Sequence, residues 1–247
     1  VVRVGYESGR RGYDPATGKK YYLEWVNLHY AIWDVTQPLS PTQVIPPTVG
    51  NTLWSGLGGR CQSDNSGDPL VLFDQLALRW IATQFAVSAA PYYECIAISQ
   101  TADPTGAWYR YAFQVHATKM NDYPHFGIWP DGYYMSANQF TGGSAWGGVG
   151  VWVFDRAKML AGDPTATFQY FDLYGVSSSY FGLLPSDWDG SRLPPPGAPN
   201  VFMAAGDSAK LGTPTDVMSL WEFHVDWNNP ANTTFGLNGQ PNYQLAV

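Results

Sequence analysis

Three aspartates precede similar segments of the sequence and could act as acids or bases. Asp68, Asp122 and Asp187 each stand before residues with the pattern of a β-strand. Two carboxyl groups facing each other across a cleft, roughly 5 Å apart for retention or 6.5 to 9.5 Å for inversion, can hydrolyse a glycosidic bond. Strands that line a common channel would bring these aspartates together near one of its ends. The alternative is that each carboxylate caps a turn, which the Gly-Asp-Pro and Asp-Tyr-Pro contexts favour.

His125 is the histidine best placed to join this group, because it follows Tyr123-Pro124 on the strand expected after Asp122. A polar core histidine is the alternative. The other histidines show no zinc-site spacing. The sequence also lacks a Ser-His-Asp elbow, a phosphate loop, a dinucleotide fingerprint and an evident arginine triad. On these grounds we expect a binding protein rather than an enzyme.

A cation site is a further expectation. Asp64, Asn65 and Asp68 supply clustered oxygen atoms in a glycine-containing loop, and such ligands suit calcium. The spacing differs from that of an EF-hand, and an Asx-rich turn is the alternative.

The two cysteines, Cys61 and Cys95, favour one disulfide bond. It would close a loop of about 35 residues and stabilise the fold by roughly 3 to 4 kcal/mol on the loop-entropy argument. Two unrelated buried thiols are the alternative. A disulfide indicates an oxidising compartment, so we expect a secreted or cell-surface protein.

Composition excludes several classes of protein. The net charge is -7 and the 13 basic residues are scattered, which argues against nucleic acid as a partner. No window reaches the roughly 18 uninterrupted apolar residues of a membrane span. Aromatic residues make up 16% of the chain, with 26 Gly and 19 Pro, so many short strands broken by tight turns are predicted.

A repeated unit is the clearest pattern. Aligned second strands begin near Tyr21, Arg79, Tyr133 and Val201, at spacings of 58, 54 and 68 residues. About four strands fall within each unit, and Asp131-Gly132 predicts a hairpin turn. This order predicts an all-β fold, a β-propeller of four-stranded antiparallel blades within a single domain, residues 1–247, that is a whole ring or part of a larger one.

Details of the expected architecture follow from the same pattern. We expect the first unit to lack its opening strand, the basic pairs Arg10-Arg11 and Lys19-Lys20 to lie in a solvated loop, and the proline-rich stretches 38–47 and 194–199 to be loops. The segment RAKMLA, 156–161, predicts one short helix. An incomplete ring would be closed by a blade shared between the two ends, by further sequence, or by another copy of the chain.

Several segments carry a family resemblance. LWSGLGGRCQSDNSGDPLVLFDQLALRWIATQFA, YYECIAIS and LPPPGAPNVFMA resemble a group of secreted bacterial proteins of uncharacterised function, over most of residues 20–235. The resemblance implies a propeller at the cell surface, often joined to other extracellular modules, and it implies no activity. Members continue beyond the equivalent of residue 247, which favours a missing C-terminal part.

Thr101 to Trp108 resembles the Asp-box of sialidases, with the glycine shifted by one position. The resemblance implies a structural turn in which Asp103 accepts backbone N–H groups, Gly106 takes a positive φ and Trp108 packs beneath.

These observations together predict a secreted or surface-displayed propeller that binds a glycan or a surface or matrix protein, or that associates with itself. The alternatives are a polysaccharide-active glycoside hydrolase or lyase that uses channel-facing Asp and His, and a structural subunit of an extracellular assembly.

Overall fold

The structure of the chain is a computed structural model that describes residues 7–190 and 192–247. The chain divides into two compact units. Unit 1 comprises Val1–Asn121 and Lys158–Pro164, and unit 2 comprises Asp122–Ala157 and Thr165–Val247. Among the described residues, no helix is long and apolar enough to cross a membrane.

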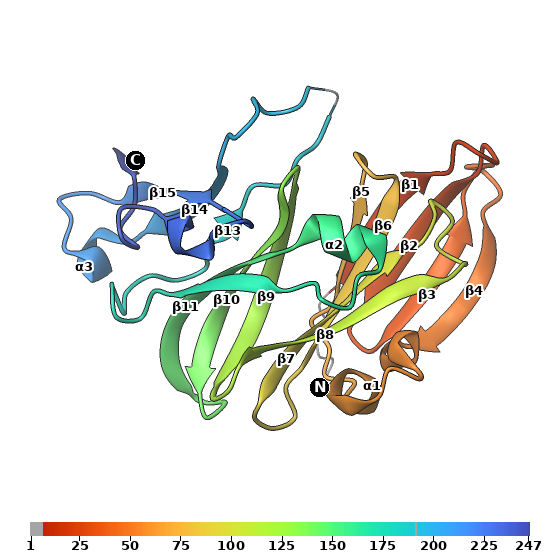
Figure 1. The fold of residues 1–247 in the computed structure, drawn as a ribbon, viewed down its shortest axis with the longest axis horizontal. Helices are drawn as coiled ribbons and strands as arrows, with labels where there is room; N and C mark the ends of the chain where they lie inside the picture. The colour runs from red at the N-terminus through yellow and green to blue at the C-terminus, as the bar shows by residue number, and fades with distance from the viewer. Residues whose placement is uncertain (1–6, 191) are drawn as a thin grey trace. The chain divides into compact units, whose positions relative to one another are not determined.

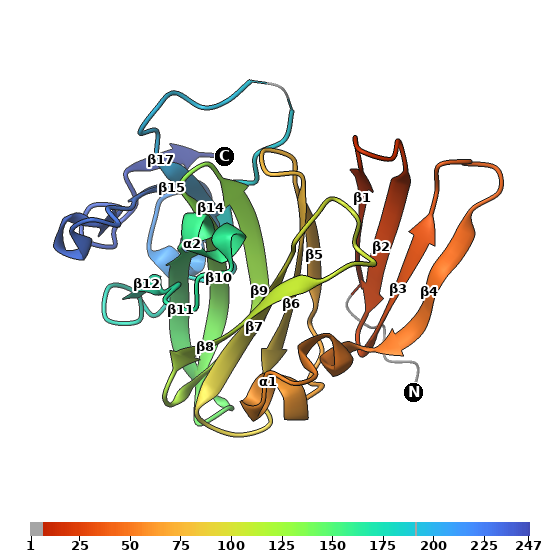
Figure 2. The ribbon, with the colours of Figure 1, turned by 45° about the vertical axis from the view of Figure 1, so that its right-hand side comes forward.

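Unit 1 contains two antiparallel sheets whose strands follow chain order (Figures 1 and 2). The first sheet consists of β1 (Glu7–Tyr13), β2 (Lys20–Val26), β3 (His29–Asp34) and β4 (Thr42–Val49). The second consists of β5 (Leu70–Asp74), β6 (Arg79–Ala86), β7 (Tyr92–Ser99) and β8 (Trp108–His116). The 3-10 helix η1 (Gly50–Trp54) and the helix α1 (Gly59–Ser63) connect the two sheets.

Aromatic and aliphatic side chains fill the space between these sheets. Trp25 and Trp80 are fully buried in one cluster with Trp54, Cys61 and Cys95. The first strands β1 and β5 lie close together, and Gly12 of β1 allows this approach, because a Cβ there would fall 2.7 Å from the ring of Phe73 in β5 and 2.4 Å from that of Trp80 in β6.

Unit 2 repeats the plan. Its first sheet has the order β12-β11-β10-β9, formed by β9 (Lys119–Trp129), β10 (Gly132–Thr141), β11 (Ala145–Phe154) and β12 (Phe168–Asp172). Helix α2 (Arg156–Ala161) lies between β11 and β12 in the chain. The second sheet consists of β13 (Leu184–Pro185), β14 (Asn200–Gly206), β15 (Val217–His224), β16 (Thr234–Phe235) and β17 (Tyr243–Ala246).

The second sheet of unit 2 is less regular than the others. Both β16 and β17 pair with β15, at opposite ends of that strand. Helix α3 (Ser208–Leu211) precedes β15, and the 3-10 helix η2 (Pro230–Asn232) follows it. The core between the two sheets of this unit is aromatic, and Phe202, Trp221, Phe223 and Phe235 are all almost fully buried.

Backbone contact between neighbouring first strands recurs in unit 2. At Gly127 of β9, a Cβ would fall 2.2 Å from the carbonyl oxygen of Ser186, just after β13. Small residues on first strands and apolar faces between sheets are what blade-on-blade packing requires. The prediction of four-stranded antiparallel blades in a β-propeller fold is therefore confirmed.

The alignment of second strands is also confirmed, since Tyr21, Arg79, Tyr133 and Val201 lie in β2, β6, β10 and β14. The predicted helix occupies Arg156–Ala161, and the Asp131-Gly132 turn joins β9 to β10.

Three local predictions are wrong. The first unit has its opening strand, because β1 pairs with β2 from Glu7 to Tyr13. Arg10 and Arg11 lie in this strand rather than in a loop. Both are exposed there, so their charges remain in solvent. The stretch 38–47 is not all loop, because β4 begins at Thr42 and includes Pro46. Proline is tolerated there because β4 is an edge strand with an irregular register, so no ladder bond needs its N–H.

Candidate functional site

The three aspartates do not occupy corresponding positions. Asp68 lies two residues before β5, whereas Asp122 is the fourth residue of β9 and Asp187 follows β13. In the turn before β9, His116 Nδ1 accepts the backbone N–H groups of Thr118 and Lys119. The expectation that each aspartate opens a blade is therefore wrong for Asp122 and Asp187.

Asp122 and His125 lie on β9 with an unusual backbone between them. Tyr123 has a φ of 52°, a left-handed conformation that is an outlier for a bulky side chain. Its ring contacts the imidazole of His125 edge-on, with centroids 4.4 Å apart. Burial raises the pKa of the Asp122 carboxyl and lowers the pKa of His125, so it favours the neutral form of both groups.

A hollow of about 500 Å³ opens beside this strand, and all of its lining belongs to unit 2. Tyr123 and His125 form one part of the lining, and Phe181, Leu184 and Met203 form another. Phe181 is 63% exposed and Tyr123 45% exposed, so both rings can be reached from solvent. The buried Nε2 of His125 has no hydrogen-bond partner within the described part of the chain.

Asp187 has a structural contact in unit 2. Its Oδ1 accepts the backbone N–H of Ile128 at 2.9 Å, and the next residue, Trp188, donates its own N–H to the Ile128 carbonyl at the same distance. The carboxylate thus joins the segment after β13 to β9. This is a long-range structural contact, and it differs from the local turn cap that was the alternative to catalysis.

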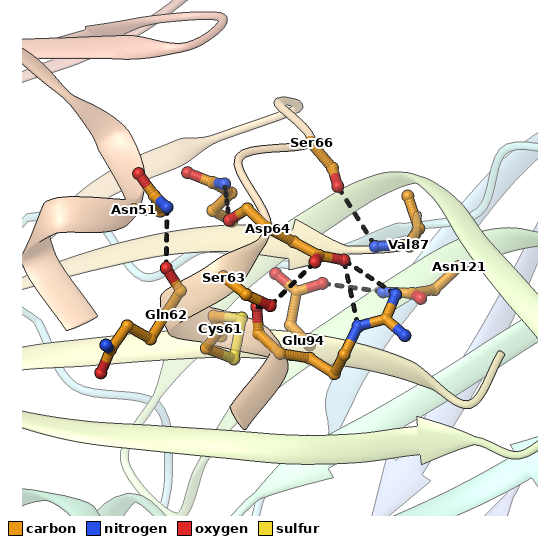
Figure 3. The surroundings of a disulfide bond; sticks show 12 residues. Asn51, Cys61, Gln62, Ser63, Asp64, Ser66, Val87, Glu94 and Asn121 are labelled. Carbon is orange, nitrogen blue, oxygen red and sulfur yellow. Dashed lines mark hydrogen bonds and ion pairs between the residues drawn. A yellow bond between two sulfur atoms is a disulfide. The ribbon is translucent and has the colours of Figure 1, made fainter. Parts of the chain in front are cut away.

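Unit 1 contains a carboxyl group that the sequence analysis did not single out. Glu94 in β7 is fully buried, and its Oε2 accepts from Asn121 Nδ2 at 2.9 Å (Figure 3). Burial raises the pKa of Glu94 to about 8. The side chains of Thr83 and Asn121 lower it, although only Asn121 makes a hydrogen bond of normal geometry, and the charge of Asp68 raises it further. One charged residue inside the apolar run YECIAIS was the available sequence signal.

Several polar atoms around Glu94 are buried without a partner. Among the residues with described placement, Glu94 Oε1, Asn121 Oδ1 and Thr83 Oγ1 have none. Asp68, whose charge contributes to the Glu94 pKa, has a φ of 46°. The group has the composition of an acid–base site, but Glu94 itself is closed off from solvent.

The structure does not support the calcium expectation for Asp64, Asn65 and Asp68. The Asp64 Oδ2 accepts from Arg60 at 2.8 Å and from the Ser88 hydroxyl at 2.7 Å. Its Oδ1 accepts from the Ser63 hydroxyl at 3.0 Å (Figure 3). Burial raises the pKa of Asp64, but the hydrogen bonds from Ser88, Arg60 and Ser63 outweigh it and hold the pKa low.

The amide of Asn65 is used as well, since its oxygen accepts from Asn51 N and its nitrogen donates to the Leu28 carbonyl. Within the described residues, no group of three His, Cys, Asp or Glu is arranged to hold a metal ion. The side chains of Asp64 and Asn65 thus make structural contacts with residues far along the chain, which a local Asx turn alone does not describe.

Cys61 and Cys95 are joined by a disulfide bond in the structure, with Cα atoms 5.6 Å apart (Figure 3). The bond links α1 to β7, and both cysteines are buried in the core of unit 1. It therefore fixes the connection between the two sheets, next to the Arg60–Asp64 ion pair.

The Asp-box-like turn is present in altered form. Asp103 Oδ1 accepts the backbone N–H of Thr105 at 2.8 Å, and Trp108 donates its indole N–H to the Pro104 carbonyl. Gly106 is not among the residues with positive φ, so that part of the expectation is wrong. The remaining Asp103 oxygen accepts from the Tyr21 hydroxyl of β2, which ties the turn to the first sheet.

Comparison with known proteins adds structural neighbours only. No family model matches the chain. No curated protein matches it either. Among solved structures, it is similar to a candidate glycoside hydrolase from Parabacteroides distasonis ATCC 8503, with 11% identity and a TM-score of 0.45 over 97% of this chain and 73% of that one.

Two further neighbours have the same identity of 11%. A GH43 endo-arabinanase from Bacillus licheniformis gives a TM-score of 0.40 over 90% of this chain and 74% of its own. A mutant α-L-arabinanase from Cellvibrio cellulosa gives 0.42 over 97% and 75%. At these values no residue role of the neighbours carries over to this chain.

The expectation of a protein without catalytic activity is corrected by this finding. The neighbours named above are described as a glycoside hydrolase and as arabinanases, which are enzymes rather than binding proteins. Whether and how this chain performs chemistry must be argued from its own residues.

Proposed function

We propose that the chain is a glycan-cleaving β-propeller in which Asp122 acts as the proton donor. The observation that carries the proposal is the position of Asp122: its pKa is raised by burial, and it precedes a residue with left-handed backbone that lines a 500 Å³ hollow. A general acid must be protonated when it acts, and a raised pKa widens the pH range in which it holds its proton. Strained backbone clusters at functional sites.

The hollow suits the faces of sugar rings. Tyr123 and Phe181 offer exposed aromatic surface, and Leu184 and Met203 add apolar walls. Aromatic rings supply large contact area to apolar ligand faces, and a few polar groups fix the ligand's orientation. His125 can be such a group, because its buried Nε2 has no partner in the described chain.

The chemistry divides between two groups. Asp122 gives its proton to the glycosidic oxygen as the bond between that oxygen and the anomeric carbon breaks. A water then adds to the anomeric carbon and gives its proton to a second carboxylate. If that carboxylate has first formed a covalent intermediate, the water gives its proton to the Asp122 carboxylate as the intermediate breaks. Asp187 is occupied by Ile128 N. Asp187 therefore does not serve as the second carboxylate in this proposal.

Location is part of the proposal. Polysaccharides are large, so an enzyme that cleaves them acts outside the cell or at its surface. The disulfide of unit 1 supports an oxidising compartment. The low share of charged residues, 13%, fits the same setting.

The test is a panel of neutral and acidic polysaccharides, with release of reducing ends, ultraviolet absorbance of unsaturated products and binding measured on the same samples. Asp122→Asn should abolish turnover and retain binding. Asp131→Asn is the matched control, because burial also raises the pKa of Asp131 but its carboxylate accepts from the Tyr134 hydroxyl at the hairpin. Undiminished turnover in Asp122→Asn would reject the assignment, and unsaturated products would indicate a lyase.

A further inference from the structure

The second sheet of unit 2 has one face in the core and one face in solvent. Side chains of a strand alternate between the two faces of its sheet. Phe202 of β14 and Trp221 of β15 point into the aromatic core, so the residues next to them in the sequence point away from it. The face that points away, called the outer face below, carries six large apolar residues from strands labelled in Figures 1 and 2: Leu184, Met203, Met218, Leu220, Tyr243 and Leu245.

Four of these residues form a row across the sheet. Leu184 pairs with Met203, and Met203 pairs with Leu220. Leu220 pairs in turn with Tyr243 of β17. Neighbouring strands lie about 4.8 Å apart, so the row extends over about 14 Å. Leu184 and Met203 are 42% and 40% exposed, so this end of the row can be reached from solvent.

A second row lies beside the first, because Met218 pairs with Leu245. Tyr243 and Leu245 share the outer face, since Gln244 between them donates to the hydroxyl of Ser219, which is almost fully buried. Tyr243 and Leu245 are 56% and 55% exposed. A contiguous exposed apolar patch of this kind indicates an interaction surface.

The chemistry of the two rows favours another sheet as the partner. Sugar rings stack on aromatic faces, and Tyr243 is the one aromatic residue of the rows. Anionic membrane surfaces attract Lys and Arg, and the rows contain neither. The inner face of the same sheet, by contrast, is covered by a sheet whose apolar residues include Val149 and Val151 of β11. An apolar sheet face fits a second apolar sheet face about 10 Å away.

We propose that the outer face binds the outer face of a second copy of the chain, in a dimer with two-fold symmetry. A two-fold contact needs only one self-complementary surface. The first row is apolar from Leu184 to Tyr243, so a copy turned by 180° meets it without burying a charge. Glu222 and His224, which also point outward from β15, lie beyond the rows and fit the polar rim that surrounds an apolar interface core.

The size of the face sets the strength of the dimer. Strand β15 has eight residues, so at about 3.3 Å per residue the face is about 26 Å long. Four strands at about 4.8 Å make it about 19 Å wide along the first row, which gives a flat area of up to about 500 Å². Specific interfaces bury at least about 600 Å² of accessible surface per partner. The face is near this lower limit, so we expect a dimer that dissociates on dilution.

The dimer would also cover part of the hollow beside β9, a consequence that rests on the proposed function. Leu184, Met203 and Met218 line that hollow and also belong to the outer face. A second copy on this face therefore excludes a glycan from one wall of the hollow. Self-association and polysaccharide binding should compete.

The test is the molar mass of the full chain in solution, measured by analytical ultracentrifugation over a wide range of protein concentration. The mass should rise from that of one chain toward that of two. Leu220→Glu and Leu245→Glu should each raise the dissociation constant of the dimer by about tenfold or more, because a carboxylate would be buried in an apolar contact. Neither residue lines the hollow, so both variants keep its lining intact.

Leu39→Glu is the matched control, because Leu39 is a fully exposed leucine of unit 1 and lies outside the outer face. It should leave the dissociation constant unchanged. Circular dichroism checks the folding of all three variants, and Leu245 guards against a folding defect at Leu220 because its side chain is more than half exposed on β17. At a protein concentration at which the parent is dimeric, Leu245→Glu should bind polysaccharide more tightly than the parent.

A mass of one chain at every concentration, or a dimer that both folded glutamate variants retain, would overturn the proposal. Equal polysaccharide binding by the parent and Leu245→Glu would show that the dimer leaves the hollow open, and competition would be wrong. If neither protein bound polysaccharide while the dimer formed and responded to the variants, the proposed function would fail and the dimer would stand.

Discussion

Glu94 of unit 1 and Asp122 of unit 2 are both carboxyl groups whose pKa is raised by burial, yet their surroundings differ. Glu94 is fully enclosed in β7 and held by Asn121. Asp122 is only partly buried and precedes the strained Tyr123 at an open hollow. A raised pKa widens the pH range in which a carboxyl group keeps its proton, but only access allows it to protonate a substrate. The comparison favours a role in stability for Glu94 and is consistent with the role in chemistry proposed for Asp122.

The largest effect is expected at Asp122. Asp122→Asn should lower the rate of polysaccharide cleavage by about 10²- to 10⁴-fold, the usual contribution of a general acid. The unfolding transition should barely change, because the amide keeps the shape of the side chain and removes an ionisable group from a partly buried position. Rates and thermal unfolding are measured on one preparation. If activity fell only in proportion to the loss of folded protein, Asp122 would have a structural role like that of Glu94.

Glu94 should govern stability through pH. Its pKa is about 8 in the folded chain against an ordinary value of 4.5, so the folded state holds an extra proton between these values. Stability is therefore greatest below about pH 4.5 as far as this group is concerned, falls as the pH rises to about 8 and then levels off. The full effect is at most roughly 5 kcal/mol, at 1.36 kcal/mol per pKa unit.

Denaturant unfolding at several pH values checks this dependence. Glu94→Gln should flatten the decline, because its side chain is neutral throughout and can still accept from Asn121. Glu222→Gln is the control, since Glu222 is a partly exposed glutamate on β15. If stability still fell with pH as steeply in Glu94→Gln, Glu94 would not be the source of the pH dependence. If Glu94→Gln lost turnover while remaining folded, Glu94 would act in chemistry rather than in stability.

The disulfide should rank next. The bonded cysteines are 34 residues apart, so opening the loop should cost about 4 kcal/mol by the entropy argument. The double variant Cys61→Ala/Cys95→Ala should unfold at lower denaturant than the parent, while Asp122-dependent turnover per folded molecule stays unchanged. Thiol titration of the denatured, unreduced parent should find no free thiol. Two titratable thiols would mean that unit 1 is held together without this bond.

Sequence patterns predicted the parts of the fold in which side-chain periodicity is strong. The second strands at Tyr21, Arg79, Tyr133 and Val201 were found because apolar and aromatic residues dominate the interior strands of each sheet. Strand β1 was missed because ESGRRGY has no apolar alternation. Strand β4 was missed because its prolines are compatible with a strand only at an edge.

The candidate site was less predictable. Asp122 and His125 could be proposed from residue type. The hollow that His125 lines also includes Phe181, Leu184 and Met203, which come from segments far along the chain and reach it only through folding. The roles of Asp64 and Asp187 depend on partners such as Ser88 and Ile128, which no local pattern indicates. The organisation of residues 1–247 as one domain remains a prediction.

The smallest effect is expected at Asp187, the aspartate that the same sequence reasoning grouped with Asp122. Asp187→Ala removes the acceptor for the Ile128 N–H and should destabilise the protein by about 1 to 3 kcal/mol, the cost of a buried donor without a partner. Asp187→Asn keeps an acceptor oxygen and should cost less. Hydrogen exchange at the Ile128 amide is the direct measurement: it should accelerate in the alanine variant and remain slow in the asparagine variant, with turnover per folded molecule unchanged in both. If Asp187→Asn abolished turnover while the Ile128 amide stayed protected, Asp187 would act in chemistry. The contrast between a structural Asp187 and a reactive Asp122 would then be wrong.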